Sequence, residues 1–329
     1  MICLGIESTA HTFGVGIVAQ DGTILANQKM VFVPPKGGIH PREAAEHHEK
    51  NAQTVFQQAL EEARLKIQKI DIIAFSQGPG LGPCLRIGAV ISRYLSQKLK
   101  IPIFGVNHCI AHVEIGRLFH NLKISDLLTL YVSGGNTLIC AFDQGRYRVF
   151  GETLDISIGN LLDVFAREAG LPHPGGPKIE KLAQAGQKFI ELPYIVKGMD
   201  LSYSGLLTAS INKFKEGNKL EDMCFSLQEI AFSMLTEVTE RALAHTEKKC
   251  VLLTGGVAAN KRLEAMIRII AEEHDAQFYN VPPALAGDNG AMIAWTGLLH
   301  AKNENSLSMD ETRVKPNWRI DEVKVTWGA

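Results

Sequence analysis

Residues 127–152 read LLTLYVSGGNTLICAFDQGRYRVFGE and repeat a pattern that also opens the chain. Three apolar or β-branched runs alternate with the small-residue turns GGNT and DQG, which predicts three antiparallel strands in succession. Residues 2–8, 13–19 and 23–31 show the same arrangement, with the turn ESTAHT at 7–12 in the place of GGNT. The repeat indicates a duplicated lobe.

Helical and strand-like segments follow each copy of the repeat. The first copy leads into a helical pattern at 42–64, an apolar run at 70–76, a helical pattern near 85–99, an apolar run at 101–106 and a helix from His108. After the second copy we expect helices over 158–170, 176–186, 203–215 and 222–247, a strand at 250–254, a helix from Ala258 and a last helix that ends near His300.

This order predicts an α/β fold with two lobes around a central cleft, and ligands of such folds bind at the turns that face the crevice. We expect lobe I at residues 1–125, joined by the C-terminal helix at about 288–329, and lobe II at residues 126–287.

The composition is that of a globular protein with one large or two mid-sized domains. The 329 residues are 46% hydrophobic and 21% charged, which excludes a disordered or collagen-like chain. A net charge of −1 excludes a strongly basic surface for nucleic acid and leaves room only for a local patch.

The six cysteines occur singly, so neither a disulfide framework nor a zinc ribbon is indicated. With no signal peptide and no apolar run of about 18 residues, we expect a soluble, cytoplasmic protein with no membrane partner.

A histidine pair is the first candidate for chemistry. His108 and His112 are four residues apart, so on a helix their side chains lie one above the other and can share a metal ion. Asp288, in the GDNG turn before the last helix, is a candidate third ligand, and this donor set suits iron or zinc. The alternative is two unrelated polar positions on a solvated helix face. A zinc peptidase is disfavoured, because Cys109 stands where the HExxH pattern needs its glutamate.

Three glycine-rich or small-residue turns are candidates for binding phosphate. In YVSGGNT at 131–137, consecutive glycines let backbone N–H groups approach an anion, although a plain hairpin turn gives the same pattern. The first repeat has Glu7, Ser8, Thr9 and His11 in the corresponding turn. In LLTGGVAAN at 252–260, Gly255 and Gly256 precede a helix whose first amides can receive a phosphate. Asn260 can bind a nucleotide there or simply cap the helix.

The stretch 159–180, GNLLDVFAREAGLPHPGGPKIE, suggests a site for sugar hydroxyls. Asp163 lies among apolar neighbours, Gly175 and Gly176 form a rigid turn between prolines, and Glu180 follows on the next helix. A solvated acid is the alternative for Asp163.

Two further segments give weaker signals. SQGPGLGPCLR at 76–86 lacks the lysine of a phosphate loop, so we expect it to shape a surface. HPREAAEHHEK at 40–50 could hold a second metal, but adjacent histidines on a charged helix usually point at solvent.

Taken together, these motifs resemble the universal tRNA threonylcarbamoyladenosine transferase family, and the closer match is its archaeal and eukaryotic type, the catalytic subunit of the KEOPS complex. The segments that carry the resemblance run from Gly5 to about Arg319: GIESTAHTFGVGIV, HPREAAEHHEKNA, SQGPGLGPCLRIGA, VNHCIAHVEIGR, YVSGGNT, IGNLLDVFAREAGLPHPGGPKIEKLA, KGMDLSYSGLLTA, TGGVAANKRL and AGDNGAMIAWTG.

The resemblance implies an actin-like, Hsp70-like ATPase fold and an acyltransferase. Such an enzyme transfers a threonylcarbamoyl group from threonylcarbamoyl-adenylate to N6 of the adenosine beside the anticodon, in tRNAs that read ANN codons. It also implies one transition metal, with iron preferred over zinc, and an adenine nucleotide, either threonylcarbamoyl-adenylate or ATP. The implied partners are tRNA and KEOPS-type subunits: a small kinase or ATPase, a dimerisation subunit and an accessory subunit.

Carried over by motif, the resemblance places the metal on His108, His112 and Asp288, with Tyr131 as a further ligand. The adenylate phosphate is expected along Tyr131, Val132, Ser133, Gly134 and Gly135, and the ribose and adenine at Asp163, Gly176, Glu180 and Asn260. Glu7, Ser8, Thr9, His11, Gly255 and Gly256 are expected on the phosphate side. Ser157 departs from the family pattern, which has glycine there.

We expect no covalent intermediate, because a carbamoyl-phosphate anhydride is already activated and mainly needs orientation and charge stabilisation. Cys109 is the nucleophile to exclude. Competing interpretations are a sugar or acyl kinase on the same fold, which would need no HxxxH metal pair, and a chaperone-like scaffold, which would need a peptide-binding domain. No feature of the sequence favours a third, DNA binding.

Overall fold

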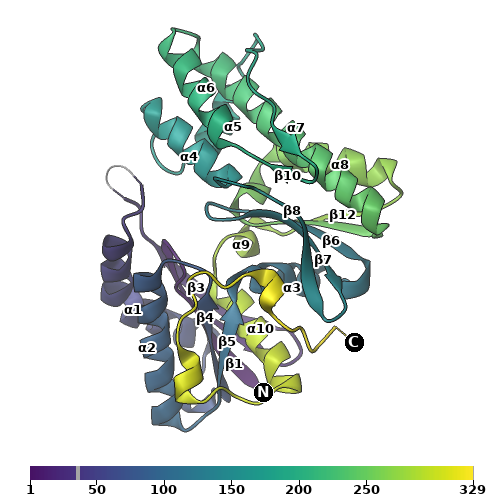
Figure 1. Cartoon of the computed structure of the whole chain (residues 1–329). Helices are drawn as coiled ribbons and strands as arrows, with labels where there is room; N and C mark the ends of the chain where they lie inside the picture. Colours follow the sequence, from purple (N-terminus) through teal and green to yellow (C-terminus); the bar gives the residue numbers. More distant parts are fainter. Residues whose placement is uncertain (35–37, 329) are drawn as a thin grey trace. The chain divides into compact units, whose positions relative to one another are not determined.

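The chain forms two compact units, each built around a five-stranded sheet (Figure 1). The structure is a computed structural model that describes residues 1–34 and 38–328. The first unit comprises Met1–Asn121, Asp143–Tyr147 and Gly287–Ala329, and the second comprises Leu122–Phe142 and Arg148–Ala286.

The sheet of the first unit has the strand order β3-β2-β1-β4-β5. Its strands are β1 (Ile2–Glu7), β2 (Thr12–Ala19), β3 (Ile24–Val31), β4 (Ile72–Gly78) and β5 (Ile103–Asn107). The first three form the expected antiparallel meander, and β1, β4 and β5 pair in parallel. Because β1, β4 and β5 run the same way, their carboxyl ends meet at one edge of the sheet.

Helices cover both faces of this sheet: α1 (Pro41–Ala63), α2 (Gly82–Leu99), α3 (His108–His120) and α10 (Gly290–Asn303). Successive residues of a strand point to opposite faces. Gly5 on β1 faces Ala294 on α10, whereas the next residue, Ile6, faces Gly88 on α2. The sheet therefore lies between α10 and α2.

Backbone-to-backbone packing fixes α10 on the sheet. A Cβ added to Gly5 would lie 2.2 Å from the Ala294 nitrogen, and one added to Gly16 would lie 2.1 Å from the Ala291 nitrogen. Gly290 in turn approaches the Gly16 nitrogen so closely that its own Cβ would lie 2.0 Å away. Only glycine fits at these contacts, and they set the position of the amino end of α10.

The second unit repeats the same strand order. Its sheet is β12-β11-β6-β7-β8, formed by β6 (Leu127–Val132), β7 (Thr137–Asp143), β8 (Arg146–Glu152), β11 (Cys250–Thr254) and β12 (Gln277–Asn280). Here β6 takes the place of β1, with β7 antiparallel to it and β11 and β12 continuing in parallel. The predicted duplication of the strand pattern is therefore present.

The helices of the second unit bury its large apolar core: α4 (Ile158–Glu168), α5 (Gly176–Ala183), α6 (Ser204–Lys215), α7 (Leu220–Thr246), α8 (Lys261–Glu273) and the short α9 (Pro283–Ala286). A small two-stranded sheet, β9 (Val196–Lys197) and β10 (Asp200–Leu201), completes the unit. The remaining turns are 3-10 helices: η1 (Ile67–Lys69), η2 (Ile124–Asp126), η3 (Gly256–Ala259), η4 (Met309–Thr312) and η5 (Ile320–Glu322).

Two helix boundaries differ from the sequence expectations. The helix expected from Ala258 begins at Lys261, because η3 and the cap residue Asn260 precede it. The C-terminal helix α10 ends at Asn303, and the segment beyond it contains only η4 and η5. None of the helices formed by residues 1–34 and 38–328 is both long and apolar enough to cross a membrane.

The close approach of α10 to β2 can be tested at Gly16. We expect Gly16→Ala to lower the free energy of unfolding by about 1–3 kcal/mol or more, because its Cβ would overlap the backbone of α10. Denaturant unfolding measures this loss. Gly82→Ala is the matched control, since its Cβ would meet Pro316 at an ordinary 3.8 Å. Equal stability of the two variants would contradict the packing described for α10.

Candidate metal centre and nucleotide-binding turns

The histidine pair lies on α3, which begins directly where β5 ends. Asn107 caps this helix, and its Oδ1 accepts hydrogen bonds from the backbone N–H of Cys109 at 3.0 Å and of Ile110 at 3.2 Å. His108 and His112 are only 5% and 0% exposed, with ring centroids 4.7 Å apart. The alternative of a solvated helix face is therefore wrong.

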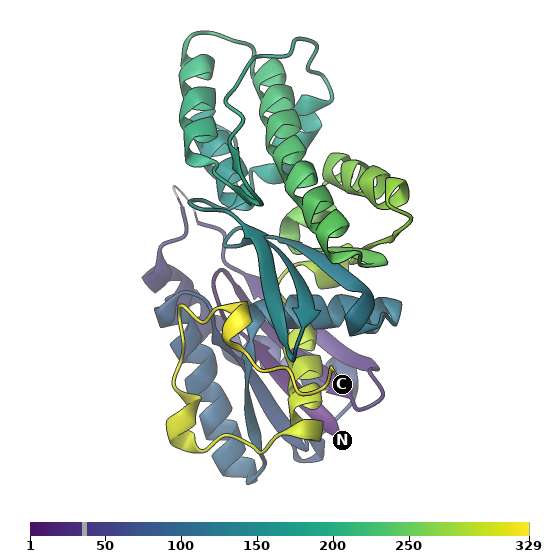
Figure 2. The same cartoon turned by 45° about the vertical axis from the view of Figure 1, so that its right-hand side comes forward.

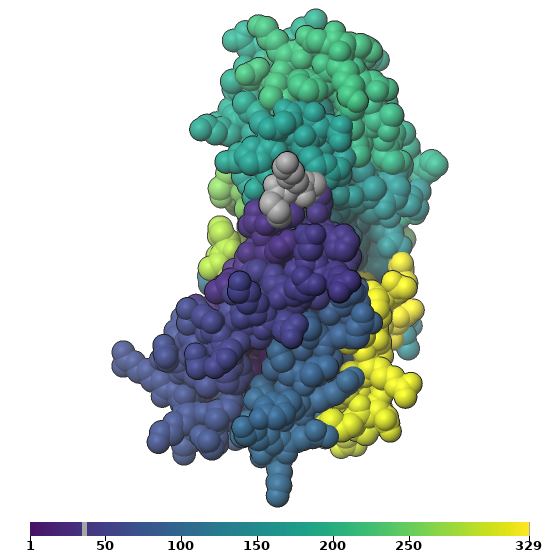
Figure 3. Space-filling view, turned by 90° about the vertical axis from the view of Figure 1, so that its left-hand side faces the viewer, coloured from purple at the N-terminus to yellow at the C-terminus, as the bar shows by residue number. Residues whose placement is uncertain are grey.

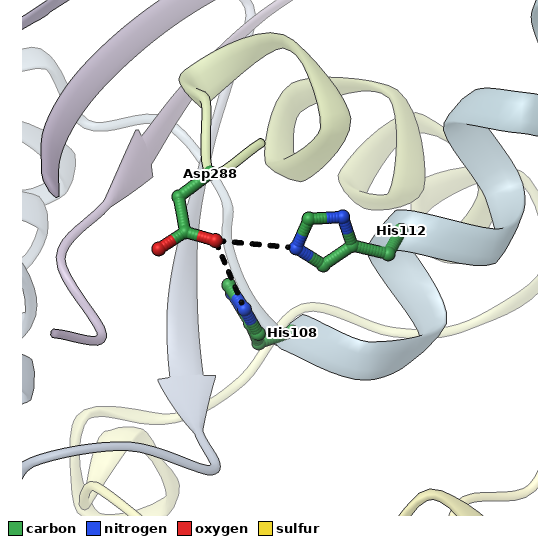
Figure 4. A group of neighbouring side chains, drawn as sticks. All are labelled: His108, His112 and Asp288. Carbon is green, nitrogen blue, oxygen red and sulfur yellow. Dashed lines mark hydrogen bonds and ion pairs between the residues drawn. The ribbon is translucent and has the colours of Figure 1, made fainter. Parts of the chain in front are cut away.

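Asp288 comes from far along the chain to face both imidazoles (Figure 4). Its Oδ1 lies 3.5 Å from His108 Nε2 and 3.3 Å from His112 Nε2. Candidate ligand atoms of the three residues all lie within 4.8 Å of one another, and we call this group the metal cluster. Two nitrogens and one carboxylate oxygen at this spacing suit a transition metal with coordination positions left for substrate. Among the described residues, no other such group of three or more His, Cys, Asp or Glu occurs.

The turn after β1 orients the first histidine. Oε2 of the buried Glu7 lies 2.9 Å from His108 Nδ1, and Glu7 Oε1 accepts hydrogen bonds from Thr9 N at 2.6 Å and Thr9 Oγ1 at 2.5 Å. A carboxylate on the outer nitrogen of a metal-binding imidazole holds Nε2 toward the ion. Glu7 thus suits an orienting role better than the phosphate-side role expected for it.

Burial and the neighbouring charges set the protonation states of the cluster. Burial raises the pKa of Asp288, but the facing His108 and His112 outweigh it and hold that pKa well below its usual range. Burial lowers the pKa of His112, which keeps that ring neutral and able to bind a metal. Burial also raises the pKa of the Cys109 thiol to about 12, with Asp288 and Glu7 adding to the effect, so this cysteine stays a thiol.

Other residues of the first turn surround the cluster less closely. His11 Nδ1 lies 4.0 Å from Asp288 Oδ2, and Ser8 N donates to Ser76 Oγ at 3.0 Å. Lys29, which the sequence did not single out, donates from Nζ to the Asp288 carbonyl at 3.1 Å. The expectation that His47 and His48 point at solvent is wrong for His48, which is fully buried against Phe13.

A buried acid on α3, Glu114, was also missed by the sequence analysis. Its Oε1 accepts a hydrogen bond from Tyr147 Oη at 2.6 Å and another from Trp327 Nε1 at 3.0 Å, and Arg117 pairs with Oε2. Glu114 therefore ties the helix of the metal cluster to the end of the chain. An isolated glutamate in an apolar helix, as in HVEIG, was the available signal.

In the second unit, two glycine turns lie side by side at the ends of β6 and β11. Tyr131 and Val132 end β6 and are buried, and Thr254 on β11 pairs with Tyr131. Gly255 adopts φ +98°, and a Cβ there would lie 2.2 Å from the Val132 carbonyl oxygen. By contrast, Cβ atoms on Gly134, Gly135 and Gly256 would meet nothing within 4 Å, so the turns present an open surface.

Ser133 and Ser157 shape the turn at 133–136. Ser133 Oγ accepts from Asn136 N at 2.9 Å, and Ser157 Oγ donates to the Gly134 carbonyl at 2.6 Å. Ser157 also caps α4 through Asn160 N. The residue that departs from the family pattern thus braces the turn expected to bind phosphate.

The polar residues expected at ribose and adenine are already held by the second unit. Asp163 Oδ1 accepts from Gly175 N at 2.7 Å, beside Gly176, and Glu180 Oε1 accepts from Lys261 N at 2.8 Å. Asn260 caps α8 through Oδ1 and donates from Nδ2 to Gln228 Oε1 at 3.1 Å. Helix capping, the simpler role considered for Asn260, is therefore present, and its role toward nucleotide remains a prediction.

Comparison with known proteins identifies the family. A sequence model of the tRNA N6-adenosine threonylcarbamoyltransferase family matches residues 22–295. The chain is 57% identical to the tRNA N6-adenosine threonylcarbamoyltransferase of Thermococcus sibiricus, over 99% of this chain and all of that protein. It is 54% identical to the protein of the same name from Methanopyrus kandleri, over 100% of this chain and 97% of that protein. The chain therefore belongs to the tRNA N6-adenosine threonylcarbamoyltransferase family, a family of transferases, as the sequence predicted.

Another relative is longer. The chain is 57% identical to a probable bifunctional tRNA threonylcarbamoyladenosine biosynthesis protein from Methanocaldococcus jannaschii, and it spans 99% of its own length but only 60% of that protein.

Solved structures agree with the predicted fold class. HypF from T. kodakarensis matches with a TM-score of 0.63 at 15% identity, over 92% of this chain and 48% of that one. Component A of the Acidaminococcus fermentans (R)-2-hydroxyglutaryl-CoA dehydratase matches with a TM-score of 0.58 at 13% identity, over 92% of this chain and 99% of that one. The expected actin-like, Hsp70-like ATPase fold is confirmed.

Metal binding at the cluster is expected to depend on pH. Burial lowers the pKa of His108, but Glu7 and Asp288 outweigh it and raise that pKa to about 9. An ion that binds below this pH must displace the proton, because only the neutral imidazole is a ligand. The apparent Kd for Co²⁺ should therefore fall about tenfold per pH unit from about pH 7 to about pH 9, then level off. A titration followed by absorbance measures it.

The control for this titration is Glu7→Gln, which removes the main interaction that keeps His108 charged. In this variant the Kd should level off at a lower pH than in the unchanged protein. A pH profile that is the same in both proteins would contradict the role given to Glu7.

The cap of α8 gives a second prediction. Asn260→Ala should lower the free energy of unfolding by about 1 kcal/mol, and Asn260→Ser should restore it, because serine caps a helix as well as asparagine does. Thermal unfolding of the three proteins measures the difference. If serine fails to restore stability, the cap is not the main contribution of Asn260. A nucleotide affinity that stays low in the serine variant would mark a direct contact.

Proposed function

We propose that this chain transfers a threonylcarbamoyl group from threonylcarbamoyl-adenylate to N6 of the adenosine beside the anticodon of tRNAs that read ANN codons. The proposal is supported most by one observation: His108, His112 and Asp288 converge in a chain that belongs to this family. In this proposal the chain works in the cytoplasm as the catalytic subunit of a KEOPS-type complex. Its partners are a small kinase or ATPase, a dimerisation subunit and an accessory subunit.

The reaction needs orientation more than activation. The N6 amine attacks the carbonyl carbon of the threonylcarbamoyl group, the new C–N bond replaces the C–O bond to phosphate, AMP leaves, and the amine loses one proton. The donor is a mixed anhydride, so the main tasks are to align amine and carbonyl and to stabilise negative charge on the carbonyl and phosphate oxygens.

The residues divide this work between them. We place the adenylate phosphate along residues 131–135 and 255–256, where Gly134, Gly135 and Gly256 offer an open surface. Asp163 and Glu180 are acceptors for ribose hydroxyls. The metal cluster, with Tyr131 as a further ligand, would hold a transition metal, for which we prefer iron over zinc, and the ion would supply Lewis acidity and a template. Glu7 keeps His108 turned toward Asp288.

No side chain of this chain forms a covalent intermediate in our proposal. Cys109 sits between the two histidines, but its pKa of about 12 leaves almost no thiolate near neutral pH. The metal-binding role and the nucleophile role can therefore be separated by substitutions on the same helix.

Reconstituted transfer tests this separation. With tRNA, threonylcarbamoyl-adenylate and the partner subunits, His112→Ala should lose metal and slow transfer at least about 100-fold, because even outer partners of metal ligands cost 10–100-fold. Cys109→Ser is the control and should retain both metal and transfer. If Cys109→Ser abolished transfer while metal content stayed normal, a covalent mechanism would replace the one proposed, and full activity of metal-free His112→Ala would remove the metal from it.

A further inference from the structure

The segment Arg313–Arg319 crosses the edge of the first unit's sheet where β4 and β5 end. Lys315 N donates to the Gln77 carbonyl at 2.7 Å, and the Pro316 carbonyl accepts from Gly80 N at 3.0 Å. Figures 1 and 2 show this part of the chain, in yellow, running beside α2. Its backbone is thus fixed by the end of β4 and by the loop that follows it.

The same segment reaches the helix of the metal cluster. Asn107, which caps α3 directly before His108, donates from Nδ2 to the Trp318 carbonyl at 3.2 Å. In the loop after β4, Leu81 N donates to the Thr9 carbonyl at 2.7 Å, and Thr9 in turn binds Glu7. The segment therefore borders the candidate metal centre within the first unit.

The segment combines positive charge with an aromatic ring, because Lys315 is exposed and Trp318 is partly exposed beside it. The ammonium of Lys315 lies 4.2 Å from the centroid of the half-buried Trp318 ring. A methyl group placed on Gly82 would lie 3.8 Å from Pro316 Cγ and 3.9 Å from Arg86 Nη1, so the exposed Arg86 adjoins the segment. Figure 3 shows the segment in yellow on the surface beside the blue of α2. We call Arg86, Lys315 and Trp318 the Lys–Trp patch.

The described chain does not neutralise this patch. Within residues 1–34 and 38–328, no carboxylate lies within ion-pair distance of Arg86 or Lys315, and Trp318 Nε1 donates no hydrogen bond. Glu311, which acts on Lys315 at longer range, is itself hydrogen-bonded to Ser308. The backbone is held at several points, while the side chains of Arg86 and Lys315 are exposed and carry charges that no ion pair among the described residues compensates.

We propose that the Lys–Trp patch binds the anticodon loop of tRNA beside the target adenosine. Single-stranded nucleic acid is bound by aromatic rings, on which bases stack, next to cations that contact the phosphates. In this proposal a base of the loop takes the place of the Lys315 ammonium on the Trp318 ring. Lys315 then contacts a phosphate on one side of that base, and Arg86 contacts a phosphate on the other. This inference rests on the proposed function for the identity of the RNA, and it gives the near-neutral chain a local surface for tRNA next to its candidate metal centre.

The experiment compares three substitutions in the full chain with its partner subunits. With saturating donor, Lys315→Ala and Arg86→Ala should each raise the KM for tRNA several-fold, and Trp318→Ala about 5- to 100-fold, with Trp318→Phe largely rescuing it. The kcat at saturating tRNA and the metal content should stay near those of the unchanged protein. Each lysine or arginine substitution removes one phosphate contact. It should therefore reduce the slope of log binding constant against log salt concentration by about one.

A second Lys–Trp pair in the same chain provides the matched control. On α10, Lys302 lies 5.9 Å from the Trp295 ring. With the rise of an α-helix, Trp295 is about 10 Å and Lys302 about 20 Å from Asp288 along the axis. Lys302→Ala and Trp295→Ala should leave the KM for tRNA unchanged.

A second measurement separates the proposed patch from the proposed function. The anisotropy of a fluorescent anticodon stem-loop reports its binding to the full chain without any transfer reaction. Weaker binding in Lys315→Ala and Trp318→Ala supports the patch even if no transfer is observed, in which case the proposed function alone fails. Unchanged binding and unchanged KM would overturn the patch. A third outcome also overturns the patch. If the variants bind the stem-loop as well as the unchanged chain does, but their KM for tRNA is higher in the presence of the partner subunits, the patch holds an acidic segment of a partner protein.

Discussion

The structure of the metal cluster depends on direct contact between the backbone of α10 and the backbone of β1 and β2. Gly5, Gly16 and Gly290 remove the side chains that would separate helix from sheet. Because the helix is seated at this depth, the residue just before its cap, Asp288, lies near His11 in the turn after β1 and faces the imidazoles of α3. A steric constraint between backbones thus decides whether three residues distant in sequence can share one ion.

The position of Asp288 lets the acids and imidazoles of the site compensate one another's charge. Four ionisable groups, Glu7, His108, His112 and Asp288, lie together with little exposure, which would be unfavourable for each of them alone. Glu7 and Asp288 flank His108 on its two ring nitrogens, and Thr9 satisfies the second oxygen of Glu7. The cluster is therefore a closed set of acids and imidazoles in which the rings are oriented before any ion binds, as expected for a preorganised metal centre.

The second unit is organised differently. Its candidate nucleotide residues, Asp163, Glu180 and Asn260, each bind backbone N–H groups of their own unit. These hydrogen bonds hold the turns and helix ends in place around open glycines such as Gly134 and Gly256. The two units repeat one strand order. The first unit has buried ionisable side chains at its candidate site, whereas the second has exposed glycine backbone. Duplication of a fold therefore does not require duplication of its chemistry.

The sequence by itself determined the strand and helix order, because alternating apolar runs, glycine turns and helical periodicity are local signals. It also determined the pair His108 and His112, since their spacing on one helix is fixed by helix geometry. The sequence also named Asp288 as a candidate third ligand, but it could not place Asp288 against the two rings. Only the tertiary structure did so, and it alone decided that Glu7 orients His108 and that His48 is buried. The physical reason is that burial and contact between residues far apart in the chain arise from the packing of helices on the sheet, which no local pattern encodes.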